Sequence, residues 1–312
     1  MVIGGNNLKK RGKSSLFPSL QPVDMSDVLG KEFSNIDIGQ DLGTLHTSTA
    51  EKRFLRTYTA ADLMSLVTKV GLEEHLSKQG LSGIFVTTDL DQNGVNYMKL
   101  YWKKEKPENI LFDLRLSETK FVPDKRFFED PEKVMAYDMI LIEWLSAQNP
   151  LTQFDGGKPQ LPGQSRPGLG VLRYCFDMMY IVAREVIKDG FLDIPDHFHG
   201  AVMYSKKFKF FDPAHEGVLR ALMRDLKDYP LYDISWGIMT GTIIEEYKNE
   251  PQPYDPSEQI FYVSERMKSY FHSGKYRSTY NKYYRRKKFR FEYDLMVSKR
   301  DEILRTKDIR EL

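Results

Sequence analysis

Residues 163–213 read GQSRPGLGVLRYCFDMMYIVAREVIKDGFLDIPDHFHGAVMYSKKFKFFDP, and this stretch decides the fold. Apolar residues recur three or four positions apart along its first half, at Leu172, Phe176, Met179, Ala183 and Val186. This spacing predicts one long helix with a single apolar stripe. Residues 191–194 and 208–211 are short apolar runs typical of strands, and a second helix is expected between them over 199–207. Alternating helices and strands are typical of an α/β protein.

Further strands are expected upstream of this stretch. Residues 83–88 and 95–102 flank Asp91-Gln92-Asn93-Gly94, whose residues suit the positive φ of a hairpin turn. A third strand is expected over 110–116. Residues 139–145 read MILIEWL, a continuous apolar run with one carboxylate, which is typical of a central strand covered on both faces. The sequence therefore predicts an α/β (α+β) protein with a mixed sheet.

The two flanks of this region are less regular. Residues 1–50 show no periodicity and many turn-forming residues, so a flexible N-terminal arm is expected there. Ordered structure is expected to begin with a short strand over 54–58. Thr59 is a suitable N-cap for a following helix, and Asp62 three residues later approximates a capping box. Residues 231–244 are expected to add a strand or to extend the core.

Composition narrows the class of protein. The chain has 312 residues, 41% hydrophobic and 29% charged, which is ordinary globular usage and excludes collagen, a coiled-coil rod and wholesale disorder. No run reaches the roughly 18 apolar residues that a membrane helix needs, and no secretory signal is expected. Cys175 is the single cysteine, which excludes an internal disulfide and a cysteine-rich zinc site. A cytoplasmic protein without a transmembrane segment is expected.

Gly168 and Gly170 lie where a loop enters the long helix. The first turn of a helix exposes backbone N–H groups that have no partners within the helix, and the helix dipole adds positive potential there. Glycine lets a phosphate approach the backbone closely, so a pyrophosphate is a natural ligand for this junction. The alternative interpretation is a tight turn without a ligand, since paired glycines occur at such junctions in many folds.

The same stretch resembles the GNAT N-acetyltransferase superfamily. In that family a Gln or Arg, two further residues, Gly, any residue and then Gly or Ala follow the fourth strand, and residues 165–170 (SRPGLG) fill this frame. Residues 200–210 look like the family's helix that carries a small residue and a Tyr before an aromatic strand, and 55–63 is similar to its usual start. The resemblance covers about 54–212. The chain departs from the motif at Ser165, which stands at the Gln/Arg position.

The resemblance implies a GNAT-like acyl-CoA N-acyltransferase fold, with acetyl-CoA as co-substrate and no metal. The coenzyme pyrophosphate would rest on the amides of Gly168, Leu169 and Gly170, with Arg166 near a phosphate. Pro167 departs from the family here because it lacks a backbone N–H.

The resemblance also implies a reaction, in which an amine attacks the thioester carbonyl. The thioester would lie between the strand ending near Leu145 and the strand starting at Leu192, where backbone N–H groups would hold the oxyanion. Tyr204 would protonate the leaving thiolate, and Glu143 would act as the base directly or through water. Two alternatives stay open: Tyr204 packs its ring only, and Glu143 faces solvent or pairs with an Arg.

Other site patterns are weaker. Asp196-His197-Phe198-His199 suggests a metal, but two His residues two positions apart share a side only on a strand, and a strand-to-helix junction is expected here. His197 could instead contact the acceptor. The sequence contains no G-x-S-x-G elbow, Walker loop or full Rossmann glycine pattern.

The C-terminal part contains a strongly basic segment. From Arg266 to Phe291 there are ten Lys or Arg residues and no Asp or Glu, which leaves −8 for the rest of a chain of net charge +2. Aromatic residues are interleaved with these cations, a pattern that suits a nucleic acid or another polyanion, including an acidic membrane. Alternatively the aromatic residues pack on the body, because Tyr276, Tyr280 and Tyr283 recur at about helical spacing.

The sequence therefore predicts three parts: a flexible arm over 1–50, a GNAT-like domain over 51–245, and a basic, aromatic-rich helical extension over 246–312. The leading functional hypothesis is acyl-CoA-dependent transfer of an acetyl group to an amine. The alternative is a non-catalytic module of the same fold that binds nucleic acid or a protein partner through its basic C-terminal segment.

Overall fold

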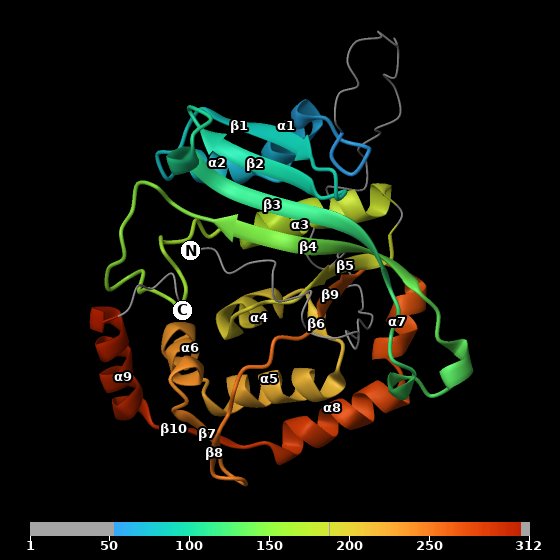
Figure 1. Ribbon diagram of the computed structural model, residues 1–312, viewed down its shortest axis with the longest axis vertical. Helices are drawn as coiled ribbons and strands as arrows, with labels where there is room; N and C mark the ends of the chain where they lie inside the picture. Colours follow the sequence, from blue (N-terminus) through green and yellow to red (C-terminus); the bar gives the residue numbers. More distant parts are fainter. Residues whose placement is uncertain (1–52, 187, 307–312) are drawn as a thin grey trace.

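The computed structural model describes residues 53–186 and 188–306, so the arm expected over residues 1–50 lies outside the described residues. The elements of the described chain are, in order, α1 (Ala60–Lys69), α2 (Leu72–Ser77), β1 (Ile84–Leu90), β2 (Asn96–Trp102), η3 (Pro107–Asn109), β3 (Ile110–Phe121), η4 (Lys125–Phe127), η5 (Pro131–Lys133), β4 (Tyr137–Ala147), α3 (Leu172–Glu185), β5 (Gly190–Asp193), α4 (Phe198–Tyr204), β6 (Lys209–Phe210), α5 (Pro213–Asp225), α6 (Leu231–Met239), β7 (Ile243–Glu245), β8 (Glu250–Pro251), β9 (Gln259–Tyr262), α7 (Glu265–Phe271), α8 (Gly274–Arg286), β10 (Phe289–Phe291) and α9 (Tyr293–Thr306). Figure 1 shows their arrangement.

A seven-stranded sheet organises the described residues, in the order β1-β2-β3-β4-β5-β9-β6. The first four strands pair antiparallel with their neighbours, β4 and β5 pair parallel, and β9 lies antiparallel between β5 and β6. A smaller sheet has the order β10-β7-β8. The expected α/β class with a mixed sheet is confirmed.

Local sequence explains the start of the fold. Thr59 and Asp62 form a complete capping box, in which each side chain accepts a hydrogen bond from the other residue's backbone N–H. The apolar face of α1 then buries Leu63, Leu66 and Val67. The expected hairpin turn is also present, with the Asp91 carboxylate accepting hydrogen bonds from two N–H groups of the turn. Residues 54–58 form a turn closed by an isolated bridge rather than the short strand that was expected.

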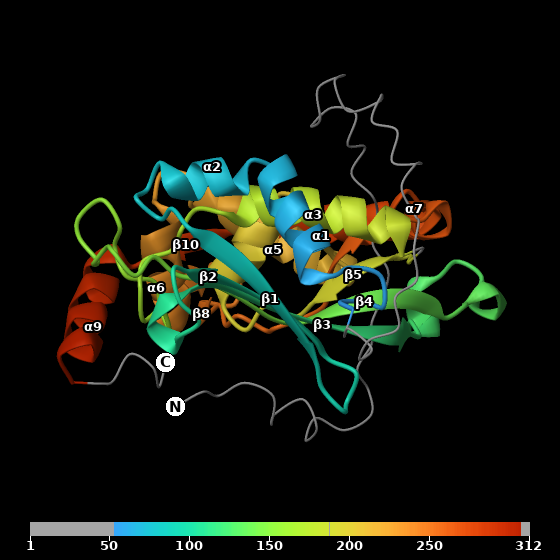
Figure 2. The same ribbon diagram turned by 90° about the horizontal axis from the view of Figure 1, so that it is seen from above.

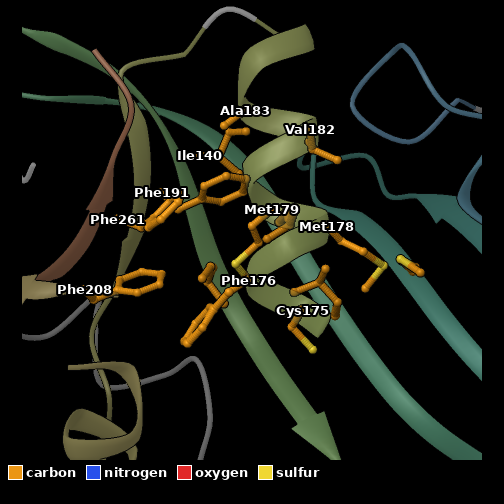
Figure 3. Close-up of a cluster of buried hydrophobic side chains, with 14 of the residues drawn as sticks. Ile140, Cys175, Phe176, Met178, Met179, Val182, Ala183, Phe191, Phe208 and Phe261 are labelled. Carbon is orange, nitrogen blue, oxygen red and sulfur yellow. The ribbon is translucent and has the colours of Figure 1, made fainter. Parts of the chain in front are cut away.

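The helices α1, α2 and α3 lie on the same side of β1–β4 (Figure 2). The predicted stripe of α3 is buried against the sheet, and Figure 3 shows Phe176, Met179 and Ala183 in the same cluster as Phe191. The ring of Phe176 lies 5.6 Å from that of Phe208, measured between centroids. Fully burying such a side chain contributes about 1.5–3 kcal/mol. This core fixes where α3 begins relative to β4 and β5.

The C-terminal part is both strand and helix. The segment 246–312 supplies β9 to the middle of the main sheet, while α7, α8 and α9 follow it. Figure 1 shows α8 at the outer edge of the molecule, with α5 packed along its inner side. Residues 231–244 were expected to add a strand or to extend the core: 231–239 form the buried helix α6, which extends the core, and 243–245 form the strand β7. None of the described helices is both long and apolar enough to cross a membrane.

Candidate functional site

The strands β4 and β5 run together for a short distance and then part. Their parallel pairing covers only Met139↔Gly190 to Leu141↔Leu192. β4 continues to Ala147 and pairs over these last residues with β3, whereas β5 ends at Asp193. Among the described strands, none therefore pairs with the β5-facing edge of β4 beyond Leu141. A sheet that opens in this way offers backbone hydrogen-bonding groups to a ligand.

A β-bulge marks the place where the two strands part. Leu116 pairs with Ile142 and Arg115 pairs with Trp144, which leaves Glu143 as the extra residue on β4. A bulge bends its strand and leaves its extra residue out of the ladder. The Glu143 side chain is exposed, and its carboxylate accepts a hydrogen bond of 2.6 Å from the Ser117 hydroxyl. Glu143 thus lies on the surface at the divergence rather than in a strand covered on both faces.

The glycine loop leads from β4 to α3, and hydrogen bonds to its carbonyl groups hold it against the body of the protein. The Asn149 N–H donates to the Pro167 carbonyl at 2.8 Å. Leu169 is buried, and the side-chain nitrogens His75 Nε2 and Gln79 Nε2 each lie 3.1 Å from its carbonyl oxygen. Arg166 and Gly170, in contrast, are exposed. The loop therefore turns its carbonyl groups toward the body and leaves part of its backbone at the surface.

The backbone N–H groups of residues 168–173 donate no hydrogen bond to any other residue that the structure describes. The first hydrogen bonds of α3 begin at Tyr174, whose N–H donates to the Val171 carbonyl, and Val171 provides no side-chain cap. Unpaired N–H groups at a helix N-terminus carry partial positive charge, which the dipole of this 14-residue helix reinforces. This is an environment that favours an anion.

Tyr204 lies beside the start of α3 and contacts a buried carboxyl group. Its ring centroid is 6.0 Å from that of Phe176, and its hydroxyl is hydrogen-bonded to the side chain of Asp193. Asp193 is the last residue of β5, and burial raises its pKa to about 8. Burial and the Asp193 charge together hold the pKa of Tyr204 well above 10. Near neutral pH both side chains are thus largely protonated.

Two histidines, His197 and His199, follow β5 in the chain. The rings of His197 and His199 stack with centroids 5.2 Å apart. Burial lowers the pKa of His199 to about 4, and within the described residues its Nδ1 has no hydrogen-bond partner. His197 touches the glycine loop, because a Cβ added to Gly163 would lie 2.7 Å from His197 Nε2. The described residues contain no group of three or more side chains placed to hold a metal ion.

The structure brings some of the predicted site residues together and separates others. Tyr204 contacts Phe176 near the start of α3, and His197 contacts Gly163 in the loop that leads to residues 168–170. Glu143 bonds to Ser117 on the exposed part of β4, and Arg166 is exposed without an ion pair to a described residue. Asp193 is an addition that the sequence did not single out. The one feature of the sequence that could have indicated Asp193 is its position as a carboxylate between the apolar residues Leu192 and Ile194 at a strand end.

Two hollow spaces in the described chain lie away from the glycine loop. A space of about 20 Å³ lies within the core between α1, α3 and the sheet. A hollow of about 170 Å³ lies beside Arg126 and Lys275. The glycine loop lines neither of these two spaces.

No protein-family model matches this chain, and no curated protein matches its sequence.

Proposed function

We propose that this chain binds an acyl-CoA, acetyl-CoA in the first instance, and transfers its acyl group to an amine. The observation that carries the proposal is the parting of β4 from β5 next to the unpaired N–H groups of residues 168–173. An extended thioester needs a slot with backbone donors along one side, and a pyrophosphate needs a positive, donor-rich surface at the mouth of that slot. The two features lie at the same end of β4.

The negative charge of the coenzyme pyrophosphate favours binding at the glycine loop. The pyrophosphate accepts hydrogen bonds from the N–H groups of Gly168, Leu169 and Gly170, and the exposed Arg166 is within the same loop to pair with a phosphate. The pantetheine arm, which resembles a short peptide, follows the unpaired edge of β4 beyond Leu141. The fold and function that the sequence resemblance implies agree with this placement.

The reaction follows from the groups around the slot. The amine nitrogen forms a bond to the thioester carbonyl carbon, the C–S bond breaks, and the electron pair leaves with sulfur. Tyr204 donates its proton to the thiolate, and Asp193, with a pKa of about 8, returns a proton to Tyr204. The relay matters because a tyrosine whose pKa lies far above 10 is by itself a weak donor to a thiolate whose pKa is about 8.5. The proton lost by the amine passes through water to Glu143 or to solvent.

Calorimetry and thermal melting with acetyl-CoA test the binding step. A ligand present at 100 times its Kd stabilises the native state by about 2.7 kcal/mol, which for a chain of this size raises the Tm by about 5–10 °C. A chain that releases no heat with acetyl-CoA and melts at an unchanged temperature rules out the proposal.

Gly168→Ala provides a sharper version of this experiment. A Cβ at Gly168 would lie 3.8 Å from its nearest neighbour, which is ordinary contact, so the variant folds with an unchanged Tm. The added methyl group nevertheless occupies the surface on which the pyrophosphate rests, and acetyl-CoA binding weakens. Gly156→Ala is the matched control, because an added Cβ there meets nothing within 4 Å. Equal acetyl-CoA affinities of the two variants would remove the glycine loop from the proposal.

Thiol release from acetyl-CoA, measured over a panel of amines, tests the proton relay. Tyr204→Phe and Asp193→Asn are expected to lower kcat with little change in the KM for acetyl-CoA, because both groups act at sulfur rather than at the pyrophosphate. An unchanged kcat in both variants would eliminate the relay while leaving coenzyme binding in place.

A further inference from the structure

The ten cations of residues 266–291 form two groups in the structure. Half of them are neutralised by carboxylates: Arg266 by Asp189, Lys268 by Glu265, Lys287 by Glu245, Lys288 by Asp225 and Arg290 by Glu292. Several of these pairs join the C-terminal segment to the body, as Lys287 does to the buried carboxylate of Glu245. These five cations therefore already have a carboxylate partner.

The other five cations all lie on α8. Arg277, Lys282, Arg285 and Arg286 are exposed and form no ion pair with any residue that the structure describes. Lys275 is also exposed, and its Nζ donates at 2.7 Å to the Phe128 carbonyl, which does not neutralise its charge. Among the ten cations of residues 266–291, those without an ion pair to a described residue thus all lie on one helix.

The aromatic residues of α8 pack toward the body, away from the line of Lys275, Lys282 and Arg286. Tyr276 is buried and donates its hydroxyl hydrogen at 2.9 Å to the Phe210 carbonyl. Gly217 of α5 lets the two helices approach closely, because a Cβ there would lie 2.8 Å from the Tyr283 Cβ and 2.9 Å from the Tyr280 carbonyl oxygen. The sequence alternative in which the aromatic residues pack on the body therefore describes these tyrosines, while the cations remain at the surface.

The outer face of α8 is a regular line of charge. Lys275, Lys282 and Arg286 are seven and four positions apart, which places them nearly in register along the helix, with Arg285 about 80° to one side and Arg277 on a different face. At 1.5 Å per residue this line is about 16 Å long. The hollow of about 170 Å³ adjoins its start and is lined by Arg126, Lys275 and Thr279, with Asp212 3.9 Å from Arg126.

We propose that the outer face of α8, defined by Lys275, Lys282, Arg285 and Arg286, binds the phosphate backbone of a nucleic acid duplex. A row of exposed cations matches a row of phosphates, and phosphate contacts supply the sequence-independent part of nucleic acid binding. A duplex fits better than a single strand because the tyrosines that could stack on unpaired bases face α5. A membrane fits less well, since none of the exposed large apolar side chains belongs to α8 and a surface helix inserts through such side chains.

Fluorescence anisotropy of the full chain with a labelled 20-base-pair DNA duplex tests this proposal as a function of salt. Each phosphate contact contributes about −0.9 to the slope of log K against log salt, so Arg285→Ala with Arg286→Ala should reduce the slope by about 1.8. Lys104→Ala with Lys106→Ala is the matched control: it removes the same charge from exposed residues of the β2–β3 connection and should leave the slope unchanged. The single variant Lys282→Gln should reduce it by about 0.9, and both α8 variants should keep the wild-type Tm because their side chains are exposed.

Three outcomes would overturn the proposal. One is a wild-type chain that does not bind the duplex at low salt. Another is an equal loss of binding in the α8 and control double variants, which would indicate that only net charge matters. The third is preference for phosphatidylserine vesicles over the duplex, which would assign the same face to a membrane. The proposal is independent of the acyl-transfer proposal, because acetyl-CoA binding should be the same in all of these variants.

Discussion

Gly190→Ala is expected to destabilise the protein strongly, because β9 packs against β5 without room for a side chain at this position. An added Cβ would overlap the carbonyl oxygen of Phe261 and lie 3.1 Å from the Cα of Tyr262, both of which are backbone atoms of β9. A carbon and a carbonyl oxygen ordinarily approach no closer than about 3.3 Å, so β9 must retreat by about 1 Å. Such a movement stretches the antiparallel pairing of Gly190 with Tyr262.

The loss of stability expected for Gly190→Ala follows from the rigidity of the β9 backbone. Overpacking a core costs about 1–3 kcal/mol, and the upper end applies here because backbone rather than a flexible side chain must move. For a chain of this size, about 3 kcal/mol lowers the Tm by about 6–12 °C. Thermal melting followed by circular dichroism measures this fall, with Gly156→Ala as the control, because an added Cβ there meets nothing within 4 Å. A Tm for Gly190→Ala within about 2 °C of the wild type would refute the close approach of β5 and β9.

Three further predictions concern the titrating groups and the contact between α5 and α8. The pKa of Asp193 is raised to about 8 in the fold, so the folded chain holds this proton more tightly and wild-type stability should fall as pH rises from about 4 to about 8; Asp193→Asn should remove this fall in Tm between pH 5.5 and pH 8. The pKa of His199 is lowered to about 4, so unfolding takes up a proton below about pH 6.5 and stability should fall as the solution is acidified toward pH 4; a wild type and His199→Asn that lose equal Tm between pH 7 and pH 5 would contradict this. Gly217→Val should cost about 1–3 kcal/mol, visible as a lower midpoint in urea, because its side chain would collide with Tyr283 and with the backbone of α8.

The sequence predicts the elements that local chemistry specifies. Thr59 with Asp62, the turn at Asp91 and the apolar stripe of α3 are signals contained within a few residues, and the structure has the expected element at each. The same holds for the entry of the glycine loop into α3, where the spacing of Gly168 and Gly170 indicates a helix start.

The sequence does not predict the features that depend on distant contacts. The helix α6 buries residues on all sides, from Ile234 through Ile238, so its pattern lacks the polar face by which a helix is recognised. The place where β4 and β5 part depends on how far β5 extends, which the apolar run 191–194 does not specify. The role of Asp193 is hidden for the same reason, because its raised pKa comes from burial that only the assembled strands provide.

The position of β9 sets the order in which this protein can be completed during synthesis. β5 and β6 are made first, but the strand that joins them is contributed by Gln259–Tyr262, after α5, α6, β7 and β8. Until that strand leaves the ribosome, the nascent chain exposes the unpaired edge of β5 and the surrounding phenylalanines to solvent or to a chaperone. Pairings between segments so remote in the chain form slowly. A ribosome stalled before residue 259 should therefore carry a chain that is sensitive to protease and prone to aggregate, even though most of its residues have already been made.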